Sequence, residues 1–358
     1  MAEHSAETPR LPSSRAFRWG IKGFIIFSLV GVVLGWWWKR PTSGAGLESN
    51  LDWGVMVWLI PLVGLDYLLG GFRYRLFFDG EVLPKISLWD CMRSNWANIF
   101  MGVVTPFQTG GGPAQCYILW RSGAKVSESV LISLVTFSAT LFFFLGSVLG
   151  ALYFLPAELF GENFNLALRT GFGAIGGVTI LVLLILFFPQ TALLAARQLF
   201  KFLPMGTPKF LRFRDNFLAI FQQKISYFGE TFQKVLRKKK LSLALVFLAT
   251  LVLFFNKYFM GYVITQGLGQ KVPFGIFLGI QCVQLFLIYF APTPGASGVA
   301  ELSTVWLMQA IMPASVLLVF AVTWRMATTI LGAIIGGFVL FFDLRRQPSQ
   351  SSKTNTSP

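Results

Sequence analysis

Long apolar stretches are the dominant feature of this chain of 358 residues. Hydrophobic residues make up 54% of the sequence and charged residues only 13%, whereas a soluble domain carries about 25% charged residues. A helix needs about 20 mostly apolar residues to cross a bilayer. The sequence therefore predicts an all-α integral membrane protein with several crossings.

The apolar runs fall into a long and a short class. Runs of the long class predict about six full transmembrane helices. They cover residues 21–38, 53–71, 129–155, 166–188, 241–265 and 315–342. The short runs flank breaks rich in glycine and proline, which predicts two re-entrant broken-helix pairs. These pairs cover residues 94–106 with 114–120, and 274–291 with 300–312.

Two regions of the chain resemble each other. Residues 112–150 share 10 identities with residues 298–336 at a constant offset of 186 (298 − 112), without a gap. Upstream, Thr105-Pro106 matches Thr293-Pro294 at an offset of 188. Because the matches include the breaks themselves, we interpret the pattern as an internal duplication.

The distribution of Lys and Arg sets the expected orientation, because cytoplasmic loops are enriched in both residues. With the polar tail 1–20 inside, every strongly basic loop falls on the cytoplasmic side, including segment 189–240. The halves 21–155 and 156–343 then have opposite orientations, an inverted internal repeat typical of alternating-access transporters. We expect a multi-pass protein of the inner cell membrane with both termini cytoplasmic, the C-terminal one within a disordered tail at 344–358.

Segment 189–240 holds 11 Lys and Arg residues against two acidic ones. Phenylalanines follow a helical spacing through it, as at Phe217, Phe221, Phe228 and Phe232. This pattern predicts an amphipathic helix in the cytoplasmic headgroup layer. The alternative is a small cytoplasmic helical bundle that packs on the membrane domain.

Several classes of function are disfavoured. The net charge of +15 is explained by cytoplasmic loops and attraction to anionic lipids, so we expect no nucleic-acid partner. The single histidine, His4, lies in a polar tail, and the three cysteines lack metal-ligand spacing. Gly110-Gly111-Gly112 lacks the Lys-Ser/Thr of a phosphate-binding P-loop. We expect no metal, no cofactor and no enzymatic activity.

Charged residues inside apolar spans cost about 2.5–3.5 kcal/mol each to insert, so each one invites a functional hypothesis. Asp66 and Lys257 begin matching motifs, Asp/Lys-Tyr-x-x-Gly, in corresponding spans of the two halves. They can pair with each other across the twofold axis of the repeat. Alternatively, Lys257 extends to the span end and Asp66 bonds Arg73 or Arg75 locally.

Glu301 and Arg325 are a second charged pair. Glu301 begins a half-helix, whose N-terminal amides favour an anion, and Arg325 has a planar donor fork that suits a phosphodiester. We hypothesise that Arg325 and glycine amides of both breaks hold a headgroup phosphate, while Glu301 contacts a cationic group or couples to protons. The alternative is a structural Glu301–Arg325 salt bridge. Further polar residues can line a groove or bond between helices, namely Asn95, Asn98, Gln108, Gln115, Gln281 and Gln284.

The motifs that carry a family resemblance are Gly70-Gly71-x-Arg73, the two breaks at 105–115 and 292–301, and Arg325. Together they resemble the flippase-like transmembrane domain of the lysylphosphatidylglycerol synthase family, over residues 15–343. The resemblance implies a membrane protein that moves or binds a phospholipid or lipid-linked molecule. The candidate substrate-binding residues are Asp66, Arg73, Gly110, Gly111, Gly112, Gln115, Pro294, Gly295, Gly298, Glu301 and Arg325.

The resemblance has two limits. In the name-giving members a soluble domain attaches lysine to phosphatidylglycerol, and we expect no such domain in the 15 residues that follow the last half. Many relatives carry Glu and, three residues later, Arg in the first break, where this chain has Gln115 and Ile118. An aminoacyl-transfer activity is therefore not carried over, and the departure at Gln115 and Ile118 weakens any expectation that the chain handles an aminoacylated lipid specifically.

These observations lead to a prediction of function with alternatives. We expect a flippase or transporter of a lipid substrate that works by alternating access, with a membrane phospholipid as its ligand, an anionic one among the candidates. A homo-oligomer is compatible with the sequence. The alternatives are a non-transporting scaffold or regulator of envelope lipid enzymes, and a membrane-embedded lipid-modifying enzyme.

Overall fold

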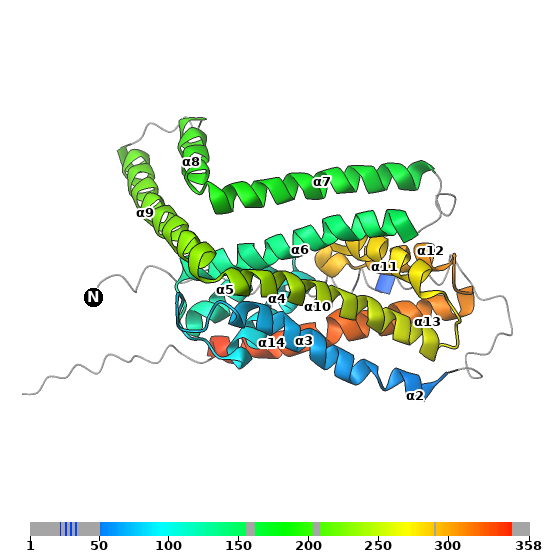
Figure 1. The fold of residues 1–358 in the computed structure, drawn as a ribbon. Helices are drawn as coiled ribbons and strands as arrows, with labels where there is room; N and C mark the ends of the chain where they lie inside the picture. Colours follow the sequence, from blue (N-terminus) through cyan, green and yellow to red (C-terminus); the bar gives the residue numbers. More distant parts are fainter. Residues whose placement is uncertain are drawn as a thin grey trace, which may run out of the picture.

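The computed structural model describes residues 51–154, 162–202, 208–289 and 291–345, with five isolated residues near the N-terminus, Lys22, Ile26, Leu29, Val30 and Val33. Helices make up almost all of this part of the chain, and it contains no β-strand. The all-α prediction is therefore confirmed (Figure 1).

The first half comprises α2 (Trp53–Met56), α3 (Leu59–Arg75), α4 (Leu88–Val104), the turn η2 (Pro106–Gln108), α5 (Gly111–Arg121) and α6 (Val126–Phe154). The second half begins with three helices, namely α7 (Glu162–Phe187), α8 (Gln190–Phe202) and α9 (Pro208–Lys238). It continues with α10 (Lys240–Gly267), α11 (Phe274–Tyr289), the turn η4 (Pro294–Ala296), α12 (Val299–Met308), α13 (Ala314–Arg325), the π-helical turn η5 (Met326–Ile330) and α14 (Leu331–Arg345).

Four helices of the described residues are long and apolar enough to cross a membrane. They are Trp53–Arg75, Val126–Ala151, Lys240–Gly267 and Ala314–Arg345, and each coincides with a predicted span. The predicted span at 166–188 overlaps α7, whose apolar part Phe172–Phe187 is shorter. The predicted span at 21–38 lies almost wholly outside the described residues.

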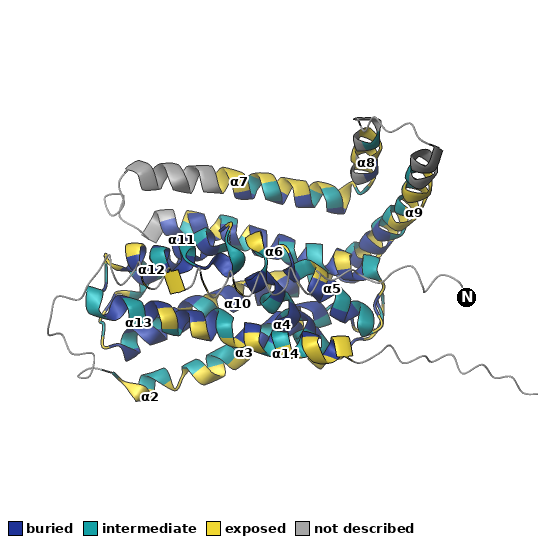
Figure 2. Ribbon diagram, turned by 180° about the vertical axis from the view of Figure 1, so that it is seen from behind, coloured by how far each residue is buried: buried dark blue, intermediate teal, exposed yellow. Residues whose placement is uncertain are grey.

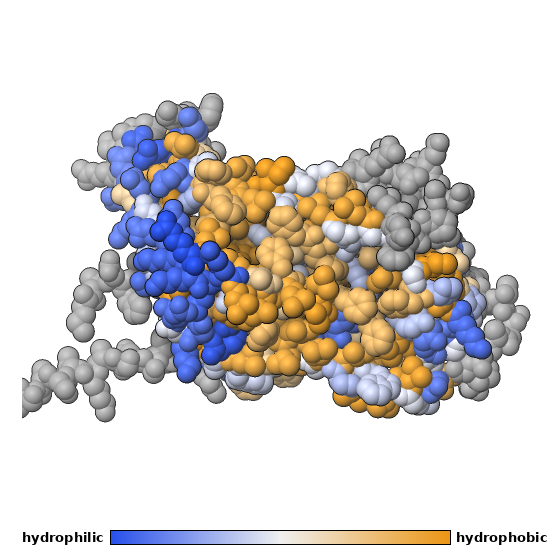
Figure 3. Space-filling model, viewed as in Figure 1, coloured by the Kyte–Doolittle hydropathy of each residue, from blue (hydrophilic) through white to orange (hydrophobic). Residues whose placement is uncertain are grey.

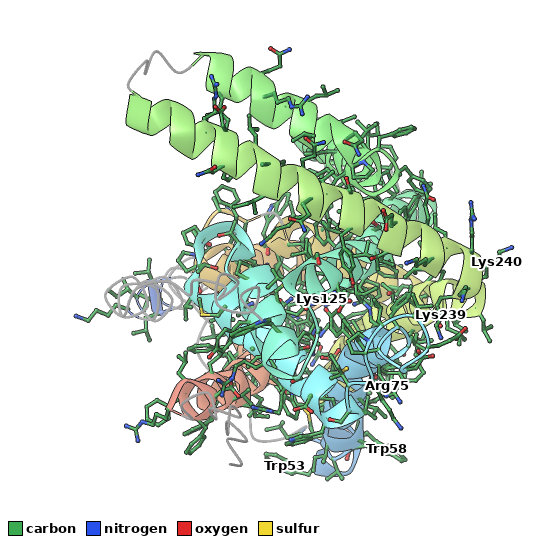
Figure 4. All side chains as sticks on the ribbon, turned by 90° about the vertical axis from the view of Figure 1, so that its left-hand side faces the viewer. Trp53, Trp58, Arg75, Lys125, Lys239 and Lys240 are labelled. Atoms are coloured by element: carbon green, nitrogen blue, oxygen red, sulfur yellow. The ribbon has the colours of Figure 1, made fainter. Side chains whose placement is uncertain are left out.

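Polar and apolar residues separate along the bundle. Arg75, Lys125, Lys239 and Lys240 gather at one end, which we term the basic end (Figure 4). A broad band of hydrophobic side chains covers the middle of the bundle beside it (Figure 3). Much of this band consists of exposed large hydrophobic residues of the long helices, such as Leu248 and Leu251 of α10. A lipid environment accounts for apolar side chains that face outward over such a large area.

The two re-entrant pairs enter the bundle from opposite ends. Near the basic end, Arg93 of α4 and Arg121 of α5 both form ion pairs with Asp343 of α14, at 2.7 and 3.3 Å. The pair α11 and α12 enters from the other end, where α10 finishes and α13 begins (Figure 1). Their turns η2 and η4 contact each other inside the bundle. The halves therefore form an inverted repeat.

Contacts between helices follow the same repeat. Gly70 of α3 lies against Asn95 of α4, where an added Cβ would be 2.3 Å from the Asn95 side chain. Gly261 of α10 likewise faces Gln281 of α11, with a Cβ at 3.3 Å from its side chain. Asn95 and Gln281 lie in the corresponding helices α4 and α11. Corresponding helices therefore both meet where a glycine faces a side-chain amide.

Segment 189–240 contains two helices, α8 and α9, which pack against each other at the basic end. The C-terminal part of α9 also packs on α6, α7 and α10, and it buries Phe228, Phe232 and Val235. The part of α9 nearer α8 exposes Phe217 and Ile220, and exposed residues recur along this part of the ribbon (Figure 2). The segment thus combines packing on the bundle with an exposed apolar face.

Candidate functional site

A cavity of about 560 Å³ lies where the two re-entrant pairs meet. Its walls come from both halves, with residues of α3, α4, η2, α5 and α6 on one side and of α10, α11, η4, α13 and η5 on the other. This volume lies within the range of typical small-molecule sites. Three lining residues are cations, namely Arg73, Lys257 and Arg325.

Arg73 is a buried cation without an ionic partner among the described residues. It lies in the last turn of α3 and is 8% exposed. Its Nη2 donates to the Thr136 carbonyl at 2.5 Å and to Thr140 Oγ1 at 3.0 Å, both in α6, whereas its Nε has no hydrogen-bond acceptor. Neutral oxygens do not compensate a buried charge, so this site favours an additional anion.

Arg325 and Glu301 fix the second break. Arg325 Nη2 donates to the Gly295 carbonyl at 2.8 Å, and its Nε lies 3.5 Å from Glu301 Oε1. The other Glu301 oxygen accepts the Gly298 amide at 2.6 Å and so caps the start of α12. The structural salt bridge is therefore present. Arg325 nevertheless also lines the cavity, whereas Glu301 does not.

Lys257 and Asp66 pair across the two halves. Lys257 Nζ lies 2.7 Å from Asp66 Oδ1 and 2.8 Å from Oδ2. The side chain of Asp66 is only 3% exposed and does not line the cavity, while Lys257 does. The predicted pairing across the repeat is confirmed, and the alternative of a local partner for Asp66 is wrong.

Gln115 is the centre of a neutral hydrogen-bond network on one wall. Its Oε1 accepts from Asn98 Nδ2 at 2.6 Å and from Tyr74 Oη at 3.1 Å. Its Nε2 donates to Ser133 Oγ at 2.7 Å. The network joins α3, α4, α5 and α6 and presents amide and hydroxyl groups to the cavity.

The second half also has a network of side-chain amides, but it lies between helices and does not face the cavity. Gln281 donates to Gln284 at 3.0 Å, and Gln284 in turn donates to Thr304 Oγ1. Gln284 lies in α11, the helix that corresponds to α4 with its Asn98. Both glutamines are buried and neither lines the cavity, so here the amides bind one helix to the next.

The turns η2 and η4 have almost the same backbone. Phe107 and Gln108 have φ values of 52° and 56°, and the equivalent residues Gly295 and Ala296 both have φ of 57°. These left-handed conformations reverse the chain inside the bundle within one short turn. The breaks therefore match in backbone geometry although their side chains differ.

Most backbone amides of the breaks are used internally. The amide of Gly110 donates to Thr105 Oγ1 at 2.8 Å, and that of Gly298 is held by Glu301. Gly111 packs so closely on Asn98 that an added Cβ would lie 2.5 Å from its Oδ1. These glycines thus allow a tight chain reversal, and the amides of Gly110 and Gly298 already have acceptors.

The structure places the predicted site residues in two groups. The first group lines the cavity and consists of Arg73, Gly112, Gln115, Gly295 and Arg325. The second group lies behind the wall or in the breaks and consists of Asp66, Gly110, Gly111, Pro294, Gly298 and Glu301. Members of the second group that carry charge are ion-paired with a lining cation.

Sequence reasoning missed part of the wall. Thr136, Thr140 and Ser133 of α6 and Thr328 of η5 line the cavity but lie in apolar spans without any motif. Only the repeat provides a signal for them, because Ser133 and Thr136 lie in the helix that corresponds to the one carrying Arg325. Among the described residues, no group of three or more His, Cys, Asp or Glu side chains is arranged to hold a metal ion.

The fold and the cavity define a polytopic α-helical membrane protein built from two inverted halves. The model of the family described as lysylphosphatidylglycerol synthase TM region matches residues 23–336, and the chain belongs to this family. The chain is also similar to a UPF0104 membrane protein of Archaeoglobus fulgidus, with 25% identity over 298 residues that cover 78% of this chain and 86% of the relative.

Proposed function

We propose that this protein moves a lipid or lipid-linked molecule that carries a phosphate group across the membrane by alternating access. The observation that carries the proposal is the cavity at the meeting point of two broken-helix pairs that enter from opposite ends. Broken helices near the bilayer midplane, one in each inverted half, are the usual site of substrate binding in secondary transporters.

The cations of the wall provide the affinity for phosphate. Arg73 comes from the first half and Arg325 from the second, so a phosphate between them is held by both halves. Charge-assisted hydrogen bonds from guanidinium groups suit this role. A relative movement of the two halves then changes the end of the bundle to which the cavity opens.

The basic end is assigned to the cytoplasm in this proposal. Arg75, Lys125, Lys239 and Lys240 lie there together, which matches the excess of Lys and Arg on the cytoplasmic side of membrane proteins. The same charge attracts the anionic lipids of a cytoplasmic leaflet. The proposal accordingly includes a location in the inner cell membrane, with the basic end at its cytoplasmic face.

A reconstituted transport assay tests the proposal. The purified protein is placed in liposomes with phospholipids labelled on an acyl chain, and an impermeant reductant quenches only the outer leaflet. We expect quenching beyond the outer-leaflet half with the wild type. Arg73→Ala and Arg325→Ala should slow it about tenfold, because each loses a charge-assisted hydrogen bond.

The matched control is Arg237→Ala, which removes an exposed arginine of α9 away from the cavity. It should translocate lipid at the wild-type rate. Glu301→Gln keeps an oxygen that can accept from the Gly298 amide but removes the charge that faces Arg325. It therefore separates the helix cap from the salt bridge. Wild-type rates for Arg73→Ala and Arg325→Ala at equal reconstitution would refute the phosphate site, and a wild-type protein that moves no lipid would favour a scaffold.

A further inference from the structure

We infer that the cavity is built for a lipid with a singly anionic phosphodiester headgroup that contains hydroxyl groups and no amine. This inference rests on the proposed transport of a lipid. It adds the class of headgroup, because the charges and neutral groups of the wall discriminate between phospholipids that share a phosphate.

The charge balance around the cavity leaves one positive charge. Arg73, Lys257 and Arg325 line it, and two carboxylates lie in contact with them, Asp66 on Lys257 and Glu301 on Arg325. Three cations less two anions leave one positive charge, which belongs to Arg73. A phosphodiester with one negative charge neutralises it, and neutralisation matters most where water is scarce.

The same wall offers no carboxylate to an ammonium group. No described lining residue is acidic, and both oxygens of Asp66 are already in contact with Lys257. A zwitterionic headgroup would bring a buried ammonium without a carboxylate to receive it. An aminoacylated headgroup would also leave the cavity with excess positive charge. Both situations are costly in a site of low dielectric.

Neutral donors and acceptors line the rest of the cavity. The side-chain amides of Asn95 and Gln108 line it and have no hydrogen-bond partner among the described residues. Thr329 also lines the cavity, with only a long contact of 3.4 Å to Thr328. These groups suit the hydroxyls of a glycerol or sugar, which both donate and accept hydrogen bonds.

The inference gives the acyl chains a route past η2. Phe107 of η2 lines the cavity and is 60% exposed. The wall at this turn is therefore not closed over by other described side chains. A headgroup can occupy the polar interior while its chains remain in the hydrophobic band, which a water-soluble phosphodiester would not require.

The test uses the full chain with lipids of identical acyl chains that differ only in headgroup. Phosphatidylglycerol, phosphatidylethanolamine and lysyl-phosphatidylglycerol are compared by native mass spectrometry for binding and by the liposome assay for movement. We expect phosphatidylglycerol to be bound and moved at least about tenfold better than the two amine-containing lipids. Water-soluble glycerophosphoglycerol, added in excess, should not displace it. Displacement at equal concentration would overturn the assignment to a lipid.

A variant that adds a negative charge makes the test sharper. Gln115→Glu keeps oxygens that accept from Asn98 and Tyr74 but adds the missing carboxylate to the wall. We expect it to reduce the preference for phosphatidylglycerol over phosphatidylethanolamine about tenfold. Gln108→Glu, at a less buried lining position, provides the same test if the first variant is unstable. An unchanged preference in both folded variants would overturn the inference.

The outcomes separate the inference from the function on which it rests. If the amine-containing lipids are moved as fast as phosphatidylglycerol, transport stands and the headgroup assignment is wrong. If phosphatidylglycerol is bound selectively but nothing is moved, the headgroup assignment stands and transport is wrong. If no lipid is bound selectively or moved, both are refuted.

Discussion

Phe107 and Gly295 occupy equivalent points of the two halves and share a left-handed backbone, with φ of 52° and 57°. Glycine adopts this conformation without strain, whereas a residue with a bulky side chain pays a cost of about 1–2 kcal/mol. The first half thus keeps a phenylalanine where the second half has the residue that the geometry favours. Retained strain of this kind is typical of functional positions.

We predict that Phe107→Gly raises the stability of the protein by about 1 kcal/mol. Phe107→Ala is the control, because it removes the same ring but keeps the strained backbone. The melting temperatures of both variants in the same detergent provide the measurement. Equal melting temperatures for the two variants would show that the left-handed turn carries no strain at Phe107.

The Asp66–Lys257 pair should behave as one unit. Asp66→Asn leaves a buried ammonium without its counter-ion, and Lys257→Gln leaves a buried carboxylate, so each should cost about 3 kcal/mol. The double variant should cost much less than the sum, since neither charge remains. Unfolding free energies of the four proteins complete the cycle, and strictly additive costs would mean that the two charges do not interact.

Gly336 of α14 should be intolerant of any side chain. An added Cβ would lie 1.9 Å from the Trp96 carbonyl oxygen of α4, so Gly336→Ala must separate two helices and lower the melting temperature. Its repeat equivalent, Gly150 of α6, has no atom within 4 Å of such a Cβ. Gly150→Ala should therefore be neutral or slightly stabilising. Similar losses in both variants would contradict the close approach.

Lys239 joins α10 to the loop after α3, and its ion pairs set a pH dependence. It bonds both Asp79 and Glu81. Burial alone would lower the pKa of Lys239, but these two bonds raise it above its ordinary value of 10.5. Burial alone would raise the pKa of Asp79, but the bonds from Lys239 and the Glu81 amide lower it below 3.8.

The sign of the pH effect follows from these two shifts. The contribution of Lys239 is complete below pH 10.5 and is lost as the pH rises through its raised pKa. That of Asp79 is complete above pH 3.8 and is lost as the pH falls through its lowered pKa. Lys239→Met should therefore lower the melting temperature by a constant amount between about pH 5 and 9, and by less outside that window. Lys238→Met, at an exposed neighbour, should have little effect at any pH.

The orientation can be tested with one added thiol. The three native cysteines, Cys91, Cys116 and Cys282, are buried, so the background of labelling should be low. Lys240 is exposed at the basic end. An impermeant maleimide should label Lys240→Cys only after the cells are permeabilised. Labelling in intact cells would place the basic end outside and reverse the proposed orientation.

Much of the fold could be predicted from the sequence, because spans and breaks have local signatures. The apolar runs and the Gly/Pro breaks locate the long helices and the re-entrant pairs. The repeat also identifies Asp66 and Lys257 as partners, although they are 191 residues apart. The cavity wall was harder to predict. Arg73 donates to the backbone carbonyl of Thr136 in α6, and no residue pattern predicts such a hydrogen bond.

The charged pair of the second break has no counterpart in the first. Gln115 stands where the repeat would place Glu301, and Ala139 stands where it would place Arg325, both at an offset of 186. Two identical halves would give a protein that rests equally well facing either leaflet. Here the halves are unequal in charge, so the state in which they have exchanged conformations has a different free energy. For the proposed carrier, this inequality predicts a preferred resting face, so that its cargo or an external gradient must supply the work that turns it to the other side.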